Sequence, residues 1–146
     1  MRALSLLLLV SVSVLAPRPA AGQTQEELVL QVRSAETAFA KTMADRDLDS
    51  FLSHVADEAV FFSGKVVLRG ADAVKDGWSP YFEGAEAPFS WGPEQVEVIE
   101  SGTLALSSGP VYNAEGNRIG TFNSIWRLEA DGRWRVVFDK GCPPCE

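Results

Sequence analysis

Three side chains in this sequence are the candidates for acid/base work: His54, Asp139 and Tyr112. His54 is the only histidine, and an unperturbed imidazole titrates near neutral pH, so it is a candidate general acid or base. A partly exposed residue late in a surface helix fits His54 equally, and we favour that interpretation because the sequence implies no nucleophile or fixed carboxylate nearby.

Asp139 follows an apolar strand pattern, which allows two interpretations. It is a candidate acid at the rim of a pocket. We favour the alternative, a structural ion pair on the sheet with Arg127, Arg135 or Lys140. Tyr112 lies on a predicted strand near a turn, from which its hydroxyl could reach a ligand.

Large aromatic residues are frequent, with eight Phe, four Trp and two Tyr. Such side chains line apolar ligand pockets, and they also fill ordinary cores. For Phe82 and Phe89 a core role is favoured, and for Trp78, Tyr81, Trp91 and Trp126 the two roles are balanced. The aromatic pocket candidates before and along the predicted strands are Trp78, Tyr81, Phe82, Trp91 and Trp126.

The only two cysteines form a terminal Cys142-Pro-Pro-Cys145 motif. A redox CxxC motif normally has a helix behind its first thiol, and the two prolines exclude one here. A local disulfide or bridges between two chains are both compatible with the motif. With one histidine, no phosphate-binding glycine loop and no nucleophile elbow, the sequence predicts no metal and no cofactor.

The chain has 146 residues, 46% hydrophobic and 23% charged, which is typical of one globular domain. Its formal net charge is -7. A nucleic-acid partner is therefore not expected, because there is no basic excess to neutralise phosphates.

The first 22 residues have the pattern of a secretory signal peptide. Arg2 precedes an apolar run over residues 4–16, and the small residues Ala20-Ala21-Gly22 follow. The run is too short for a comfortable membrane span, so no stable membrane anchor is expected. The sequence predicts cleavage after Gly22, a domain over residues 23–141, a tail over residues 142–146, and a periplasmic or secreted protein.

The first half of the predicted domain has helical patterns. Thr24 and Glu27 fit a capping box at the start of a helix over residues 25–45. Its apolar stripe, at helical spacing, is Leu28, Val32, Ala35, Phe39 and Met43.

The rest of the domain predicts further helices and then a sheet. Residues 47–54 and 71–79 are typical of short helices, and a hairpin over residues 59–68 lies between them. After Phe89 the pattern becomes alternating, which predicts about four antiparallel strands. Helices followed by an antiparallel sheet indicate the α+β class, and a sheet curled around a long helix leaves a cone with an open end.

Three segments resemble one known superfamily. Residues 35–61 look like the opening of the SnoaL-like, nuclear transport factor 2-like superfamily, 67–74 like its entry to the third helix, and 125–139 like its last hairpin. The chain is most similar to an exported subgroup of unknown function. The resemblance implies a cone-shaped, curved antiparallel sheet packed on three N-terminal helices, a deep pocket and a homodimer.

The superfamily includes ketosteroid isomerase, polyketide cyclases, dehydratases and binding proteins without activity, so the fold does not fix the function. Ketosteroid isomerase needs a carboxylate base and two oxyanion donors, a Tyr and a protonated Asp. The resemblance places Phe39 at the Tyr position, Phe62 or Ser63 at the base and Ser124 at the second Asp. Phe39, Phe62 and Ser124 are thereby pocket candidates, but the isomerase chemistry does not carry over.

Three functions remain. We favour a protein that binds a small, largely apolar molecule in its cone. The alternatives are a cofactor-independent isomerase, cyclase or dehydratase that uses acid/base residues in the same pocket, and a module that dimerises through its sheet.

Overall fold

The structure, a computed structural model, describes residues 22–144. The predicted signal peptide lies almost entirely outside these residues, as does Cys145. Within residues 22–144, no helix is long and apolar enough to cross a membrane.

The first element is the long helix α1 (Gln25–Asp45), which has the predicted bounds. Its capping box is complete: the Glu27 N–H donates to Thr24 Oγ1 at 3.2 Å, and the Thr24 N–H donates to Glu27 Oε2 at 2.7 Å. Arg46, with a left-handed φ of 63°, ends the helix. The buried face differs from the predicted stripe at two places: Glu36 is buried where Ala35 is only half-buried, and Thr42 is buried as well.

Three short helical elements follow α1. Asp47 caps α2 (Leu48–Ser53) by accepting the Ser50 N–H at 2.9 Å. Helix α3 (Ala71–Trp78) runs into a 3-10 turn, η1 (Ser79–Phe82), in which Pro80 blocks continuation of the α-helix.

Seven strands form one curved sheet in the described part of the chain. Their order is β2-β1-β7-β6-β5-β3, and β4 also pairs with β5. The strands are β1 (Val55–Ser63), β2 (Val66–Arg69), β3 (Phe89–Trp91), β4 (Gln95–Val98), β5 (Leu104–Asn113), β6 (Arg118–Leu128) and β7 (Trp134–Lys140).

The α+β class and the curved sheet are confirmed, but the sheet is mixed. Strand β1 pairs with β7 in parallel, whereas all other pairs are antiparallel. Parallel partners need a long connection, and nearly the whole domain lies between β1 and β7. Local alternation therefore could not reveal this pair.

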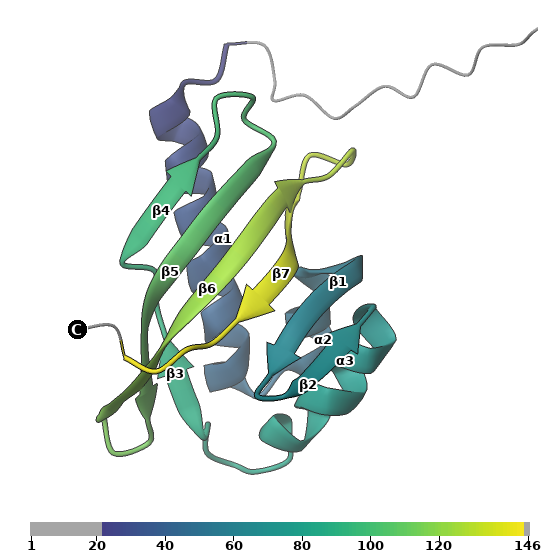
Figure 1. The fold of residues 1–146 in the computed structure, drawn as a ribbon, viewed down its shortest axis with the longest axis vertical. Coiled ribbons are helices and arrows are strands. Elements are labelled where there is room, and N and C mark those ends of the chain that lie inside the picture. The colour runs from purple at the N-terminus through teal and green to yellow at the C-terminus, as the bar shows by residue number, and fades with distance from the viewer. Residues whose placement is uncertain (1–21, 145–146) are drawn as a thin grey trace, which may run out of the picture.

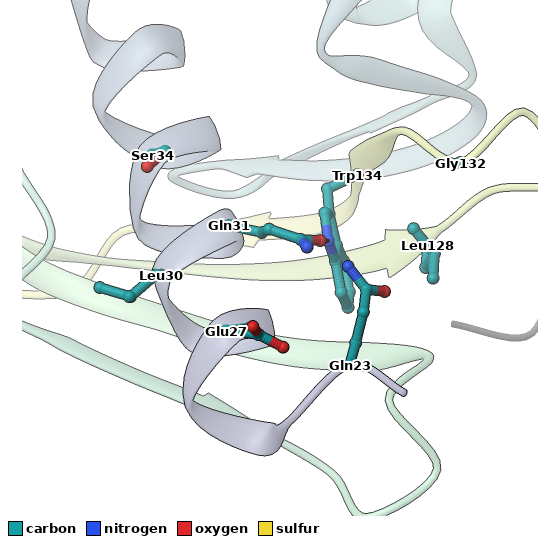
Figure 2. A pocket seen from close by; sticks show the side chains of 8 residues that line it. All are labelled: Gln23, Glu27, Leu30, Gln31, Ser34, Leu128, Gly132 and Trp134. Carbon is teal, nitrogen blue, oxygen red and sulfur yellow. Dashed lines mark hydrogen bonds between the residues drawn. The ribbon is translucent and has the colours of Figure 1, made fainter. Parts of the chain in front are cut away.

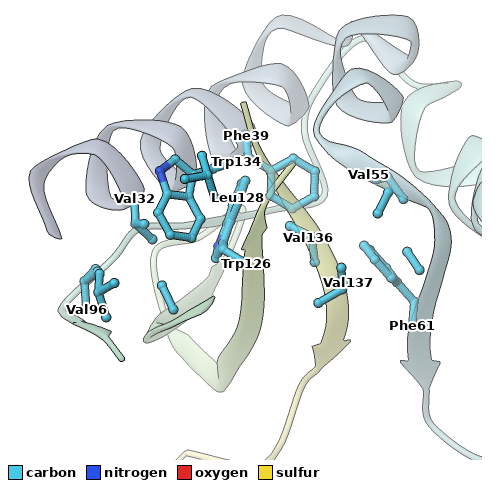
Figure 3. Close-up of a cluster of buried hydrophobic side chains, with 14 of the residues drawn as sticks. Val32, Phe39, Val55, Phe61, Val96, Trp126, Leu128, Trp134, Val136 and Val137 are labelled. Atoms are coloured by element: carbon cyan, nitrogen blue, oxygen red, sulfur yellow. The ribbon is translucent and has the colours of Figure 1, made fainter. Parts of the chain in front are cut away.

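Helix α1 lies across the inner face of the sheet, behind β4, β5 and β6 in Figure 1. Figure 3 shows Phe39 of α1 against Trp126 and Val136 of the sheet. The Phe39 ring stacks on Phe51 of α2 at a centroid distance of 4.6 Å and meets the Trp126 ring edge-on at 5.8 Å. These contacts fix α1 on the sheet.

A bulge at Val137 changes which side chains of β7 point inward. Trp126 pairs with Val136, but the next pair is Ile125 with Phe138, so Val137 is an extra residue. The alternation that the sequence predicts is therefore reversed beyond this point. Phe138 is 49% exposed, and Asp139 pairs with the buried Ser124.

Candidate functional site

A small cavity lies where η1 and the ends of β1, β3 and β7 meet α1. Its volume is about 170 Å³. An engineered cavity of about 150 Å³ in another protein holds one benzene molecule, so this one suits a ligand of single-ring size. Aromatic side chains dominate the wall, and Asp139 is its only carboxylic acid. The lining residues are Phe39, Phe62, Ser63, Trp78, Tyr81, Phe89, Trp91, Val111, Phe122, Asp139 and Gly141.

Asp139 is the titratable acid of this cavity. Ser124 Oγ donates to its Oδ2 at 2.8 Å. Burial raises the pKa of Asp139 to about 7, and the charge of Glu36 acts in the same direction, while the Ser124 hydrogen bond opposes both. The Asp139 carboxyl can therefore gain or lose a proton near neutral pH.

The ion pairs that we favoured for Asp139 are not formed. Arg127 binds Glu58 at 2.6 Å and Glu129 at 2.7 Å. Arg135 binds Asp131 at 2.7 Å. The Lys140 ammonium lies 5.7 Å from the centre of the Phe62 ring. That interpretation was wrong because the bulge turns Asp139 inward, away from these cations.

Directly behind the cavity wall lies a second acid, Glu36, with 0% exposure. Trp91 Nε1 donates to its Oε1 at 2.8 Å, and Trp126 Nε1 donates to its Oε2 at 2.7 Å. Burial raises the pKa of Glu36, and hydrogen bonds from the two indoles and from nearby serines oppose this rise. The sequence analysis missed Glu36.

The polar groups of this region form a row across three strands. Ser107 of β5 pairs with Ser124 of β6, which pairs with Asp139 of β7. The pKa of Glu36 of α1 is lowered by both serines of this row, which acts against the rise caused by burial. The Ser107 hydroxyl is buried and completes no hydrogen bond of ordinary geometry with any described residue.

The structure places five of the eight pocket candidates in the cavity wall: Phe39, Phe62, Trp78, Tyr81 and Trp91. The wall residues that the sequence analysis did not propose for the pocket are Ser63, Phe89, Val111, Phe122 and Gly141. Most of them lie at strand ends whose meeting point depends on the sheet's curvature.

Three pocket candidates lie outside the wall. Trp126 is fully buried, because its indole is directed at Glu36 instead of the cavity. Ser124 is also fully buried and reaches the site only through Asp139. Phe82 packs on Phe51 with a centroid distance of 5.2 Å and belongs to the core.

The other two acid/base candidates also lie outside the cavity wall. His54 is half-buried, with its ring 5.6 Å from Phe39 and 6.3 Å from Trp126. Burial lowers the pKa of His54, and the charges of Arg133 and Arg135 lower it further. Tyr112 is 38% exposed on β5.

Neither the cysteines nor a cluster of metal-binding side chains forms a second candidate site within residues 22–144. Cys142 is a free, half-buried thiol whose Sγ lies 3.6 Å from the Thr121 carbonyl oxygen. Cys145, the other cysteine of the motif, lies outside the described residues, so neither predicted disulfide pairing is tested. No group of three or more His, Cys, Asp or Glu side chains in that part of the chain could hold a metal ion.

A wider hollow of about 850 Å³ lies at the opposite end of α1. Figure 2 shows Gln31 and Trp134 directed toward one another there, and Trp134 Nε1 donates to Gln31 Oε1 at 3.2 Å. Its only acid, Glu27, is engaged in the capping box. Because this hollow offers no free titratable group, the smaller cavity is the candidate site.

Comparison with known proteins identifies the family. The SnoaL-like domain family matches residues 32–144. The chain belongs to the SnoaL-like domain family, and its fold is that of the nuclear transport factor 2-like superfamily. The predicted superfamily is thus confirmed. No curated protein matches the sequence.

Solved structures with this fold are distant in sequence. An NTF2-like protein of unknown function from Pseudomonas putida has a TM-score of 0.65 and 18% identity, covering 81% of this chain and 87% of its own. A ketosteroid isomerase-like protein from Erwinia carotovora atroseptica has a TM-score of 0.64 and 17% identity, covering 82% of this chain and 98% of its own. A proposed dehydratase of the NTF2-like family from Streptomyces avermitilis has a TM-score of 0.65 and 19% identity, covering 84% of this chain and 100% of its own. These similarities establish the fold alone.

Proposed function

We propose that this protein is a cofactor-independent acid/base catalyst that acts on a small, largely apolar molecule, with Asp139 as the group that transfers the proton. The observation that supports this proposal is a carboxylic acid in the wall of an aromatic cavity with a pKa of about 7. General acids and bases work best when their pKa lies near the pH at which they operate.

The lining also favours a reaction class. Proton removal next to a carbonyl group needs a base and a hydrogen-bond donor for the oxygen that becomes negative. Asp139 supplies the base, and Tyr81 and Ser63, whose side chains carry hydroxyl groups, line the same cavity. The remaining wall is mostly aromatic, which suits an apolar ring.

This proposal reverses the preference for a pure binding protein. That preference came from Phe39, Phe62 and Ser124, which replace the catalytic groups of ketosteroid isomerase. Asp139 lies outside those three positions, and the structure brings it to the cavity by another strand. The solved relatives described as ketosteroid isomerase-like and as a proposed dehydratase are compatible with such chemistry.

The test is exchange of the α-protons of cyclohexanone with D₂O, followed by proton NMR at pH 7. We expect the wild-type protein to accelerate the exchange and Asp139→Asn to reduce this acceleration by about 10²–10⁴-fold, the usual contribution of a positioned base. Asp57→Asn, on an exposed part of β1, is the control and should match the wild type. Binding of cyclohexanone without acceleration would instead support the binding protein, and unchanged exchange in Asp139→Asn would remove Asp139 from the reaction.

We also propose that the protein is exported, as the first 22 residues predict. Protein purified from the periplasm or medium of its source should begin at Gln23, which N-terminal sequencing will show. A purified chain that still begins at Met1 would contradict the export proposal.

A further inference from the structure

A shallow groove adjoins the aromatic cavity. Its volume is about 460 Å³, and it shares three lining residues, Phe62, Val111 and Gly141, with the cavity wall. The turn after β1, the start of β6 and residues 142–144 form the rest of its lining. Because the two hollows meet at three common residues, a single ligand of sufficient length can contact both.

Residues 142–144 form one wall of the groove because the chain pairs with β6 after leaving β7. The Thr121 N–H donates to the Cys142 carbonyl oxygen at 2.9 Å, and the Cys142 N–H donates to the Thr121 carbonyl oxygen at 2.9 Å. In Figure 1 this segment runs from the end of β7 across β6. Gly120 permits the close approach, since a Cβ there would lie 2.9 Å from the Cys142 carbonyl oxygen. The pairing therefore fixes the wall that Pro143 and Pro144 continue.

The groove is apolar, and its polar groups bond to one another or to a neighbour. None of its lining residues in the described part of the chain carries a charge. The backbone groups of Thr121 and Cys142 bond to each other, and the Thr121 hydroxyl accepts from Arg118 Nη2 at 3.1 Å. In contrast, Ile119 and Phe62 are 51% and 36% exposed. Such a surface suits a hydrocarbon chain, because a charged or polar ligand group would lose water there without gaining a charged partner.

We propose that the groove is a second subsite, which takes an unbranched alkyl chain attached to the ring of the substrate. The substrate class is an alkyl-substituted cyclic ketone, whose ring lies in the cavity at Asp139 and whose chain passes Phe62 to reach Ile119. This inference rests on the proposed function and deepens it, because it adds a substrate class to the proton transfer. A ring without a chain would occupy only the cavity of about 170 Å³ and leave the apolar groove in contact with water.

Binding at pH 7, followed by NMR spectra of the full-length mature protein, tests the subsite without any need for catalysis. The indole N–H signals of Trp78 and Trp91, which line the cavity, report the ring, and the δ1-methyl signal of Ile119 reports the chain. Each buried methylene contributes up to about fourfold in affinity, so we expect 4-butylcyclohexanone to bind at least about tenfold more tightly than cyclohexanone. We expect only the butyl compound to shift the Ile119 signal.

Two results in the wild type would overturn the subsite. One is an affinity for 4-butylcyclohexanone that is no higher than that for cyclohexanone, including no binding of either. The other is an Ile119 methyl signal that stays in place when the butyl compound shifts the indole signals of Trp78 and Trp91. Neither criterion needs a variant.

Ile119→Asp places a carboxylate in the groove and should abolish the preference for 4-butylcyclohexanone over cyclohexanone. Ile99→Asp is the matched control, because Ile99 is 50% exposed, against 51% for Ile119, and lies outside both hollows. The control should keep the wild-type preference. A preference that persists in Ile119→Asp, or one that Ile99→Asp loses as well, would mean that the chain binds elsewhere.

A second copy of this chain is the alternative occupant of the groove. Sedimentation velocity of the wild type and of Ile119→Asp distinguishes the two occupants. A wild-type dimer that Ile119→Asp converts to a monomer, together with no preference for the butyl compound, would assign the groove to an interface between copies and overturn the subsite.

Failure of the subsite and failure of the proposed function give different results. Loss of cyclohexanone exchange in Asp139→Asn without any preference for the butyl compound would refute the subsite and leave the catalyst. A preference that Ile119→Asp abolishes, with unchanged exchange in Asp139→Asn, would support the subsite for the alkyl chain and refute the catalyst.

Discussion

Replacing Asp139 by asparagine is expected to raise the free energy of unfolding at pH 8 by about 2–4 kcal/mol. Burial raises the pKa of Asp139 from 3.8 to about 7. At about 1.4 kcal/mol per pH unit, the ionised carboxylate costs the folded state about 4 kcal/mol above pH 7. Asparagine carries no charge, and the loss of the charge-assisted bond from Ser124 offsets part of the gain.

The sign of this effect sets its pH dependence. The Asp139 pKa is higher in the folded than in the unfolded chain, so the folded state binds the proton more tightly. The stability that the bound proton of Asp139 gives to the folded state is fully present below pH 3.8 and is lost as the pH rises to about 7. The wild type should therefore lose stability relative to Asp139→Asn across this window, and the two should be nearly equal near pH 4.

Urea unfolding of both proteins at pH 4.5 and pH 8 measures the difference. Asp57→Asn, which removes an exposed carboxylate, should show no comparable gain at pH 8. A lower stability of Asp139→Asn than of the wild type at pH 8 would mean that Asp139 is a stabilising structural residue. A gain would instead indicate an acid kept in the cavity at a cost to stability, as is common for catalytic groups.

Much of the fold follows from local patterns. The capping box of Thr24 and Glu27 and the turn at Arg46 set both ends of α1, and the alternation after Phe89 reveals most of the sheet. These signals act over a few residues, which is why sequence patterns contain them. The pairing of β1 with β7 leaves no such local signal in the sequence, because the two strands are far apart in the chain.

Two features of the site cannot be deduced from local sequence patterns: the burial of Glu36 and the direction of the Asp139 side chain. Ala35 and Glu36 are both compatible with the helical spacing from Val32 to Phe39, and hydropathy favours the alanine. The indole donors of Trp91 and Trp126, on distant strands, are what stabilise the buried glutamate instead.

The second feature is the face of the sheet to which the Asp139 side chain points. Strict alternation from Trp134 directs Phe138 inward and Asp139 outward. One extra residue at Val137 reverses this order, and a shift of one residue moves every later side chain to the other face. The sequence near Val137 has no glycine or other local sign of a bulge, so the acid in the cavity could be proposed from the sequence but not placed there.

Phe39→Ala is expected to lower the free energy of unfolding by about 3–5 kcal/mol, the range for truncating a buried phenylalanine. Phe39 is 2% exposed, and its ring contacts Phe51, Trp91 and Trp126 at centroid distances of 4.6, 5.5 and 5.8 Å. Loss of this ring removes the contact that joins α1, α2 and the sheet. Urea unfolding of the wild type and of Phe39→Ala, at pH 7 and low protein concentration, measures this change in the free energy of unfolding.

Phe138→Ala is the matched control, because it removes the same atoms from the outer face of β7, where Phe138 is 49% exposed. It should cost under about 1 kcal/mol, as most exposed positions do. Equal losses in the two variants would contradict the assignment of Phe39 to the core between α1 and the sheet. Because Phe39 also lines the cavity, a large loss in Phe39→Ala alone would mean that part of the cavity wall belongs to the core and is held rigid by the same packing that stabilises the fold.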